Sequence, residues 1–387
     1  MGKKLYKGSF FKHFIIIYDP RQEGKVRHKL IDILFIAVAA SICYCNEWLD
    51  MEDWATQNEE WLRQYLELPN GIPSWYTIKR VFDVIDPKQF EKCFAGWVRQ
   101  ITKMKEGTVV AIDGKTMRGT DDEKSGKRAV HIVSAWCSEN NLVMGQVKTK
   151  DKSNEITAIP ELLDLLLIKG AIVTIDAMGC QKDIATKIAK TKKADYVLSL
   201  KENHPLLHEE VEAYFKDAEQ NDFQGIGHYR TLDKGHGRIE DRKYYYSTDI
   251  KWMDARKDWT KLTGIGMVIR RCEKKGKVTE ERAYHLSSVA TVEEYASGVR
   301  KHWGVESMHW SLDVTFREDA NRTRTGQAPQ NLALLKRMSM NMVKKDQERY
   351  PKRSLRSRRF LASLKYVTIS FVLSIVRFLL RLLNFEL

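Results

Sequence analysis

The sequence predicts an α/β protein, in which a mixed sheet carries helices on its faces. A helical region precedes this sheet and a β-rich insertion interrupts it. Near residue 107 the pattern changes from helical periodicity to short β-branched runs that alternate with helices. The order strand, strand, strand, helix, strand, helix, strand implies a mixed rather than an all-parallel sheet. Hydrophobic residues make up 43% of the 387 positions, enough to fill the core of two or three domains.

Residues 1–104 are expected to form an N-terminal helical domain. Apolar residues recur at helical spacing, and Pro69, Asn70 and Gly71 supply a turn. The expected helices are 28–45, 47–66, 74–85 and 87–101. A DNA-contacting role and a plain packing role are both open for this region.

The catalytic part of the chain is expected in two pieces, 105–204 and 291–345, around a β-rich insertion at 205–290. Alternating residues predict strands in that insertion. The core strands expected are 108–112, 129–138, 142–148, 171–175 and 196–200, with helices at 155–168 and 182–190. Residues 291–313 return to a helical pattern and supply the last core helix.

The tail, residues 346–387, is basic and then apolar. Between residues 344 and 359 eight Lys or Arg face two acids, which suits a phosphate-binding arm or a solvated tail. Arg377 and Arg381 interrupt the apolar stretch, and its clean run falls short of the roughly 20 residues that span a bilayer. No stable membrane insertion is expected.

The charge balance points to a polyanionic partner. Lys and Arg exceed Asp and Glu by 65 to 51, a net charge of +14 with a pI near 9.3. Such a chain usually binds DNA or RNA, although a merely basic enzyme has the same composition. The six cysteines form no CxxC pair, so neither a zinc site nor a disulfide framework is predicted. Reduced thiols in a cytoplasmic protein are the expectation.

Two aspartates follow apolar strands in matching contexts. Asp113 ends Val-Val-Ala-Ile-Asp and Asp176 ends Ile-Val-Thr-Ile-Asp, and a small residue comes after each. If the strands are neighbours, the two carboxylates converge and repel each other unless a cation lies between them. Oxygen ligands of this kind suit Mg²⁺ or Mn²⁺. The alternative is that each Asp merely ends a strand or caps a turn.

A third group of candidate ligands lies on the helix expected around residues 300–313. His302, Glu306, His309 and Asp313 fall on one face, flanked by tryptophans. That face could point into a cleft and supply a carboxylate. It also suits a zinc or iron centre, although the two histidines are seven residues apart and the HExxH pattern is absent.

Five stretches resemble the H-repeat-associated class of bacterial insertion-sequence transposases. They are AIDGKTMRGT (111–120), TIDAMGCQKDIA (174–185), ADYVLSLKENHP (194–205), GHGRIEDRKY (235–244) and HWGVESMHWSLDVTFREDANRTR (302–324). Residues 18–34 and 68–82 resemble the region that precedes the catalytic part of this family. The resemblance runs in order from about residue 10 to about residue 360.

The resemblance implies a ribonuclease-H-like core with a DDE triad of Asp113, Asp176 and Glu306. It implies Mg²⁺ or Mn²⁺ as cofactor, and cleavage and strand transfer of an insertion sequence as the reaction. DNA (terminal inverted repeats and target), a homodimer and the bacterial nucleoid are the implied partners and location. Val299, His302 and Asp313 stand where the broader group has Tyr, Arg and Lys around its Glu. Asp313, Glu318 and Asp319 are alternatives to Glu306 as the third ligand.

Further residues are candidates for DNA contacts. Three groups of side chains are suited to hold phosphates. They are the cations that follow the first Asp, a polar group after the strand at 196–200, and one face of the strand near residue 240. A cross-strand salt-bridge ladder would explain the last group equally well. Trp303 could stack on an unpaired base, although most such side chains belong to a core. The candidates are Lys115, Arg118, Lys201, His204, His236, Arg238, Arg242, His302 and Trp303.

Overall fold

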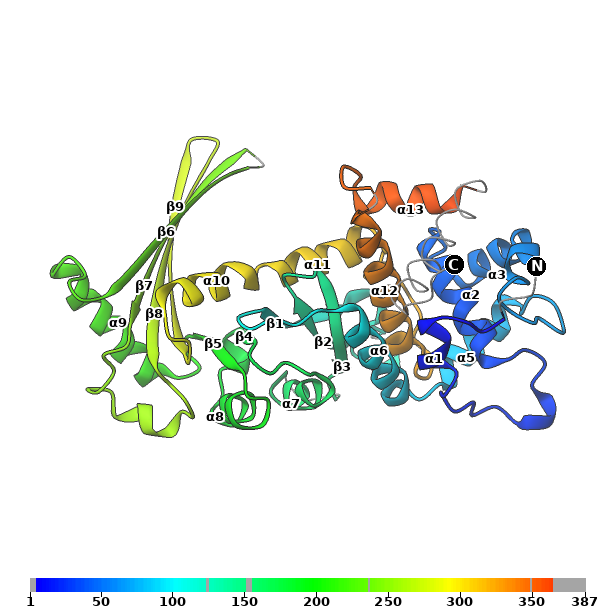
Figure 1. Ribbon diagram of the computed structural model, residues 1–387, viewed down its shortest axis with the longest axis horizontal. Coiled ribbons are helices and arrows are strands. Elements are labelled where there is room, and N and C mark those ends of the chain that lie inside the picture. Colours follow the sequence, from blue (N-terminus) through cyan, green and yellow to red (C-terminus); the bar gives the residue numbers. More distant parts are fainter. Residues whose placement is uncertain (1–4, 123–124, 151–154, 236, 349, 365–387) are drawn as a thin grey trace.

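A computed structural model describes residues 5–122, 125–150, 155–235, 237–348 and 350–364 (Figure 1). Among these residues, nine strands form one mixed sheet in the order β3-β2-β1-β4-β5-β9-β8-β7-β6. The strands are β1 Val109–Met117, β2 Val130–Cys137, β3 Leu142–Lys148, β4 Ile172–Ile175, β5 Asp195–Leu200, β6 Gly227–Gly235, β7 Arg238–Ser247, β8 Gly264–Lys274 and β9 Lys277–Ser287. The fold class predicted from the sequence, α/β with a mixed sheet and flanking helices, is confirmed.

The sheet combines two kinds of pairing. β1, β4 and β5 run parallel to one another, and β2 and β3 pair antiparallel on the other side of β1. β9 pairs antiparallel with β5, and β8, β7 and β6 follow antiparallel outward. The strands of the predicted insertion therefore continue the central sheet, and they form the long twisted extension in Figure 1.

Helices cover both faces of the parallel part of the sheet. Val110 and Ile112 of β1 pack into one core with α7 (Glu155–Leu165) and α8 (Lys182–Thr186). The alternate residues of β1, Val109 and Ala111, lie in the cores on the opposite face. α10 (Val292–His302) and α11 (Gly304–Val314) follow each other across that face (Figure 1). This alternation is the period of two expected for a strand buried on both faces.

The N-terminal helices share one apolar core with the last helices of the chain. α2 is buried along its whole length and contacts α12 (Ala328–Lys345). An apolar helix without a polar face needs neighbours on all sides, and α3, α5, α12 and α13 supply them. The remaining bounds are α1 Ser9–Phe14, α2 Leu30–Ile42, α3 Trp48–Gln57, α4 Glu59–Leu62, α5 Trp75–Val84, α6 Pro87–Ile101, α9 Pro205–Gln220 and α13 Leu355–Ser363.

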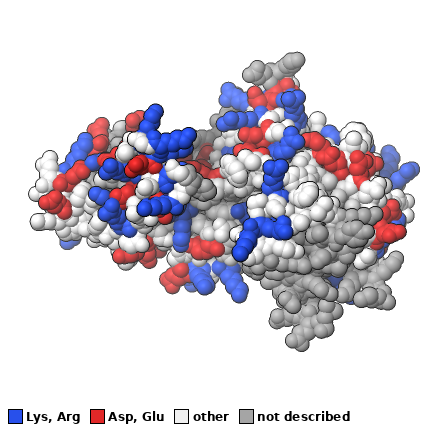
Figure 2. Space-filling model, turned by 90° about the horizontal axis from the view of Figure 1, so that it is seen from above, with Lys and Arg blue, Asp and Glu red and all other residues white. Residues whose placement is uncertain are grey.

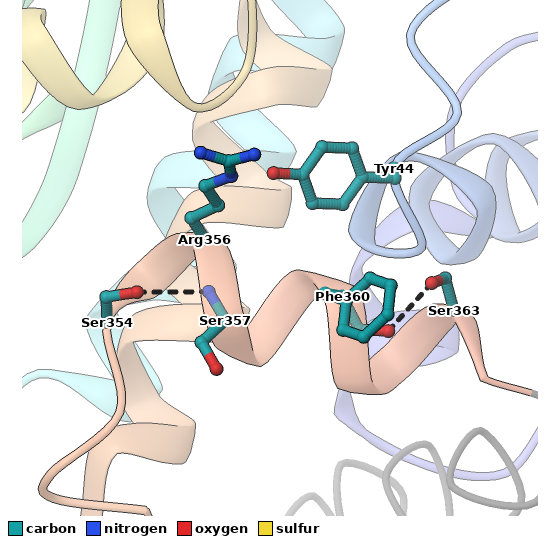
Figure 3. Close-up of a pocket in the computed structure, with 6 residues that line it drawn as sticks. All are labelled: Tyr44, Ser354, Arg356, Ser357, Phe360 and Ser363. Carbon is teal, nitrogen blue, oxygen red and sulfur yellow. Dashed lines mark hydrogen bonds between the residues drawn. The ribbon is translucent and has the colours of Figure 1, made fainter.

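A surface pocket of about 470 Å³ lies between the turn after α2 and α13 (Figure 3). Ser354 caps α13 by accepting a hydrogen bond from the backbone N–H of Ser357. The described residues that line the pocket are Tyr44, Ser354, Arg356, Ser357, Phe360 and Ser363. None of these six is acidic, so this pocket offers no carboxylate for a metal. The predicted apolar segment 366–387 lies outside the described residues.

No helix in the described part of the chain has the length and apolar character that a membrane crossing requires.

A buried ion pair joins three elements below the sheet. Glu318, after α11, and Arg337, on α12, are both fully buried, with Oε1 and Nη1 2.6 Å apart. Nε of Arg337 also donates to the hydroxyl of Ser134 on β2, 3.2 Å away. Burial raises the pKa of Glu318, but the charges of Arg337 and Lys115 lower it by a larger amount, so the net shift is downward.

We expect Glu318→Ala to lower the free energy of unfolding by about 3–5 kcal/mol, because it leaves the Arg337 guanidinium buried without its counter-charge. Urea denaturation followed by circular dichroism measures this loss. The matched control is Glu59→Ala, which removes the exposed i,i+4 pair with Arg63 and should cost less than about 0.5 kcal/mol. Equal losses for the two variants would contradict the assignment of a structural role to the buried pair.

Candidate active site

Asp113 and Asp176 come together where the parallel pairing of β1 and β4 ends. The last paired residues are Ile112 and Ile175, and the aspartates follow each of them directly. One expectation needs correction: Asp113 does not end its strand. β1 continues to Met117, with Asp113 opposite Ser134 of β2. Antiparallel pairing with β2 holds this extension, and the sequence pattern, which turns polar after Ile112, does not reveal it.

Asp176 leaves the sheet and caps the turn that follows. Its Oδ1 accepts hydrogen bonds from the backbone N–H groups of Met178 (3.1 Å) and Gly179 (3.4 Å). The capping role considered for this residue is therefore present. One oxygen of Asp176 still lies within 4.8 Å of ligand atoms from Asp113 and Glu155, so capping and convergence occur together.

Glu155 is a member of this cluster that the sequence did not single out. It is the first residue of α7 as described, and it is 8% exposed. An acid in the first turn of a helix is normally explained by the helix dipole, so its position gave no signal of function. A side chain on residue 114 would overlap the Glu155 carboxylate, and Gly114 allows the close approach to β1.

Glu306 lies on α11, and α10 positions this helix over the sheet. The aromatic ring of Tyr295 on α10 packs where Gly266 has no side chain, and its hydroxyl shares a hydrogen bond of 2.9 Å with Nδ1 of the buried His285. At the end of α10, Nδ1 of His302 and the hydroxyl of Thr174 on β4 share a hydrogen bond of 2.8 Å. The end of α10 is thus fixed to β4, the strand that Asp176 follows, and α11 continues from there over β1 and β2.

The face of α11 predicted from the sequence does meet β1. Nδ1 of His309 lies 3.6 Å from Oδ2 of Asp113, and Asp313 pairs with Lys115 at 2.7 Å. Burial lowers the pKa of His309 to about 3, so near neutral pH this imidazole is uncharged and its contact with Asp113 is not an ion pair. Gly304 makes the close approach of α11 possible, because a Cβ there would meet the indole of Trp136.

The convergence of carboxylates appears directly in their electrostatics. Burial raises the pKa of Asp113 to about 7, with repulsion from Glu155 as the second cause and from Asp176 and Glu306 as lesser ones. Burial and then Glu155 raise the pKa of Asp176, while backbone N–H groups and Lys201 oppose the rise. Burial also raises the pKa of Glu306, which Arg270 partly offsets. The cluster therefore resists carrying its full negative charge without a cation.

The residues present fit a divalent cation with oxygen ligands. Asp113, Glu155 and Asp176 each offer a carboxylate oxygen, and Oε2 of Glu155 is buried without a hydrogen-bond partner. Carboxylate oxygens are the ligands that Mg²⁺ and Mn²⁺ prefer. Among the described residues, neither His302 nor His309 belongs to this group. The hypothesis of a zinc or iron centre is therefore not supported by a histidine ligand in it.

A second acidic cluster nearby is neutralised by cations. Nζ of Lys115 lies 2.7 Å from Asp313, 2.6 Å from Asp319 and 3.4 Å from Glu318. Lys115 is only 8% exposed, so its ammonium is committed to these carboxylates rather than open to a phosphate. The three acids considered as alternatives to Glu306 thus lie around an internal cation.

The other predicted cations near the carboxylates differ in exposure. The side chain of Arg118 is 86% exposed and only loosely paired with Asp319, at 3.8 Å. Lys201 is exposed beyond the end of β5, and its charge acts on Asp176. Nε2 of His204 donates to the carbonyl of Cys180 at 2.7 Å, which fixes the loop after Asp176.

The predicted basic face of the insertion is mostly an internal salt-bridge ladder. Arg242 is 5% exposed and pairs with Asp233 (2.6 Å) and with Glu240. Arg238, 45% exposed at its side chain, also pairs with Glu240 at 3.1 Å. His236 lies outside the described residues. Arg242 therefore makes the cross-strand pair that the ladder alternative requires, whereas Arg238 pairs with a residue of its own strand.

Trp303 stands beside Glu306 at the start of α11. Its side chain is 39% exposed, and the guanidinium of Arg270 from β8 lies over its ring at 4.7 Å. Seen from above, Lys and Arg side chains occur over the middle of the molecule and over the β6–β9 end, with acidic side chains among them (Figure 2). The excess of positive charge is thus spread over this face.

Comparisons with known proteins agree with this geometry. Residues 104–342 match the family model described as "Transposase DDE domain", and residues 11–98 match "DDE_Tnp_1-associated". "Putative transposase YncI" of Escherichia coli O157:H7 is 43% identical over 342 residues, which is 87% of each chain. "H repeat-associated putative transposase YhhI" of Escherichia coli K12 is 37% identical over 366 residues, 91% of this chain and 96% of its own. "Inactive transposase YbfQ" of the same strain is 43% identical over 70 residues, 18% of this chain and 83% of its own.

The chain therefore belongs to the DDE transposases. Within them it belongs to the H-repeat-associated class, as the resemblance of its motifs predicted. Membership of this family implies DNA binding and, in general terms, nuclease and transesterification chemistry.

The way α10 is anchored generates a pH dependence of stability. Burial, followed by repulsion from His302 and Lys201, lowers the pKa of His285 to about 3, below its ordinary value of 6.5. The unfolded chain then binds a proton that the folded chain excludes, so stability is complete above pH 6.5 and falls as the pH falls toward 3.

We expect His285 to contribute a loss of roughly 2 kcal/mol in the free energy of unfolding between pH 7 and pH 5. His285→Gln should reduce that pH-dependent loss, although the variant is less stable at pH 7 because it alters the contact with Tyr295. Urea denaturation at a series of pH values in EDTA measures the slope. Because the imidazole of His228 is exposed, His228→Gln is the control. An unchanged slope in His285→Gln would contradict the assignment.

Proposed function

We propose that this chain is a metal-dependent DDE transposase that cuts DNA at the ends of an insertion sequence and joins them to a target. The observation that carries the proposal is the convergence of Asp113 and Asp176 at the end of the β1–β4 pairing, with Glu306 within electrostatic range of Asp113. Family membership supplies the reaction class. The acidic cluster supplies a chemical reason to bind a divalent cation.

We propose a ribonuclease-H-like core for the catalytic part. The strand order β3-β2-β1-β4-β5, with β1, β4 and β5 parallel and β2 and β3 antiparallel, supports this assignment. The helical region before residue 105 and the strands β6–β9 are then additions at the two ends of that core. In this scheme the segment 205–290 is an insertion that extends the catalytic sheet.

Glu306 is the third carboxylate of the proposed triad. The alternatives Asp313, Glu318 and Asp319 are each within 3.4 Å of Lys115, and Glu318 also pairs with Arg337. Acids that are already neutralised have little to gain from a metal. In the part of the chain that the structure describes, Glu306 forms no ion pair. The charge of Arg270, which also contacts the ring of Trp303 and pairs with Glu240, lowers its pKa.

The chemistry is two in-line displacements at phosphorus. A water oxygen first forms a bond to the phosphorus at the element end, and the bond to the 3′-oxygen breaks. That freed 3′-hydroxyl then attacks a phosphorus of the target: a new P–O bond forms to the element end while the target's own bond to its 3′-oxygen breaks, which leaves a 3′-hydroxyl on the target strand. Mg²⁺ or Mn²⁺ held by Asp113, Asp176 and Glu306 would activate the attacking oxygen and stabilise the leaving one. The carboxylates fix the site of reaction at the sheet edge, and the neutral His309 packs beside Asp113 without competing for it.

The DNA partners are the terminal inverted repeats and the target. The exposed side chains of Arg118 and Lys201 are the best placed of the predicted cations to meet phosphates, and Trp303 offers a partly exposed ring. Joining two element ends calls for two active sites, so we propose a homodimer in the synaptic complex. The bacterial nucleoid is the proposed place of action.

A second function is a DNA-binding relative that has lost catalysis or only hydrolyses DNA. The relative named "Inactive transposase YbfQ" gives this alternative a specific basis. Intact carboxylates at positions 113, 176 and 306 argue for the active form. Nicking without joining is the result that distinguishes a nuclease from a transposase.

We expect the wild-type protein, with Mg²⁺ or Mn²⁺, to nick and join a DNA fragment that carries its element ends. Asp113→Asn, Asp176→Asn and Glu306→Gln should each lower both rates by at least about a hundredfold, because ligands matter at least as much as the residues around them. Gel electrophoresis of labelled DNA measures both products. Asp183→Asn and Glu293→Gln, at exposed acids on α8 and α10, are the matched controls.

Binding of the same DNA by the three variants shows that they remain folded. If Glu306→Gln stays active while the Asp variants are dead, the third ligand lies elsewhere. If the wild type binds DNA but neither nicks nor joins it with either metal, the inactive form is the correct function.

A further inference from the structure

Glu155 is buried against the two catalytic aspartates without being neutralised there. The residue is 8% exposed, and one of its oxygens lies within 4.8 Å of ligand oxygens of both Asp113 and Asp176. Its Oε2 has no hydrogen-bond partner among the described residues. A buried polar atom left unpaired costs on the order of 1–3 kcal/mol, and more when it is charged. An unpaired carboxylate oxygen beside two further carboxylates therefore favours the binding of a cation at this site.

The carboxylate of Glu155 is held in place from its other oxygen. Nε2 of His131 on β2 donates to Oε1 of Glu155 at 2.8 Å, and the hydroxyl of Thr116 on β1 contacts Nδ1 of the same imidazole at 2.8 Å. The chain Thr116–His131–Glu155 therefore fixes both the ring and the carboxylate. This arrangement, in which one oxygen is hydrogen-bonded and the other left open, is how surrounding residues orient metal ligands.

The backbone of β1 is shaped to admit this carboxylate. Gly114 directly follows Asp113, and a Cβ at this position would overlap both Oε1 of Glu155 and Nε2 of His131. Any other residue would push Glu155 away from Asp113. The φ angle of Gly114 is not in the left-handed region, so the requirement for glycine here comes from space and not from backbone conformation.

We propose that Glu155 is a fourth carboxylate ligand of the metal centre and that His131 is the residue that positions it. The inference rests on the proposed function, because it concerns the same cation. Asp113, Glu155 and Asp176 contribute from β1, α7 and the end of β4, and Glu306 contributes from α11 on the opposite face of the sheet. The centre is then built from four elements rather than three.

The competing explanation is that Glu155 only pairs with His131 to anchor the start of α7. The two explanations differ in what an isosteric amide would do. Glu155→Gln keeps an oxygen for the bond from His131 but removes the negative charge and the strongest metal donor. If Glu155 is a ligand, this variant loses metal affinity while metal-free stability is kept, since a charge that repels Asp113 is gone. If Glu155 is only an anchor, the variant keeps its metal affinity and loses metal-free stability.

The experiment is a Mn²⁺ titration of the full-length protein followed by electron paramagnetic resonance of the free ion, with no DNA present. We expect Glu155→Gln to weaken Mn²⁺ binding by at least about 10-fold, the lower limit for residues that merely orient ligands. His131→Ala should weaken it by a smaller factor. Glu161→Gln, at an exposed acid on the same helix, should bind as the wild type does. Thermal unfolding in EDTA should give Glu155→Gln a midpoint no lower than that of the wild type.

A second variant tests ligation directly. Glu155→Cys introduces a soft thiolate, which favours Cd²⁺ over Mn²⁺. We expect it to bind Cd²⁺ with a sulfur-to-cadmium charge-transfer band in the ultraviolet, while Glu161→Cys shows no band beyond that of the native cysteines. Such a band requires the side chain at position 155 to touch the metal, which a purely structural role does not provide.

The outcomes separate this inference from the proposed function. If the wild type binds Mn²⁺ and Glu155→Gln binds it equally well, Glu155 is not a ligand, although the metal-dependent function stands. If Glu155→Gln unfolds at a lower temperature in EDTA and Glu155→Cys gives no band, Glu155 is an anchor for α7. If the wild type itself fails to bind Mn²⁺, both the inference and the metal-dependent function are overturned.

Discussion

Beyond Ile112 and Ile175 the parallel pairing of β1 and β4 ends, and the next residue along the chain in each case is an aspartate. Two carboxylates fixed to adjacent strands cannot move apart to relieve their repulsion. The rest of the site intensifies this conflict, because α7 adds Glu155 and α11 adds Glu306 to the electrostatics of Asp113. Asp113, Asp176 and Glu155 converge within 4.8 Å of one another, and burial together with the neighbouring carboxylates raises the pKa of Asp113, so this site favours a bound cation.

The neighbouring acidic cluster differs from this one in how its charge is balanced. Asp313, Glu318 and Asp319 are also close together, but Lys115 lies among them and Arg337 pairs with Glu318. Lys115 and Arg337 form direct ion pairs with this group, whereas among the described residues no Lys or Arg forms an ion pair with Asp113, Asp176 or Glu155. Structural acids are neutralised from within, whereas acids that serve a metal must be left available. The difference in compensation, and not the number of acids, separates the two clusters.

Local sequence patterns predict several features of this site, but other features depend on contacts between distant segments. Apolar runs ending at Asp113 and Asp176 predict two strands with carboxylates beyond them, and the spacing of Glu306, His309 and Asp313 predicts one helix face that points into a cleft. These features depend on neighbours within a few residues. The role of Lys115 was predicted from proximity to Asp113 alone, yet its ion pairs are with residues about 200 positions away.

The local sequence does not predict Glu155 as a site residue, for a similar reason. An acid at the start of a helix has an ordinary local explanation, and only the tertiary fold brings it beside Asp113 and His131. The continuation of β1 past Asp113 and the attachment of β9 to β5 are likewise set by strand pairing between distant segments. Long-range pairing is the part of the fold that periodicity does not encode.

The attachment of β9 to β5 also links the insertion to the chemistry. Because β6–β9 continue the catalytic sheet, Arg270 on β8 is held in a fixed relation to α10 and α11. Its guanidinium lies over the ring of Trp303, pairs with Glu240 and lowers the pKa of Glu306. A DNA base that stacked on the face of Trp303 covered by Arg270 would have to displace this guanidinium. Its release would remove a positive charge that opposes metal binding at Glu306. If the proposed roles of Trp303 and Glu306 hold, base stacking on Trp303 and cation binding at Glu306 would favour each other through Arg270.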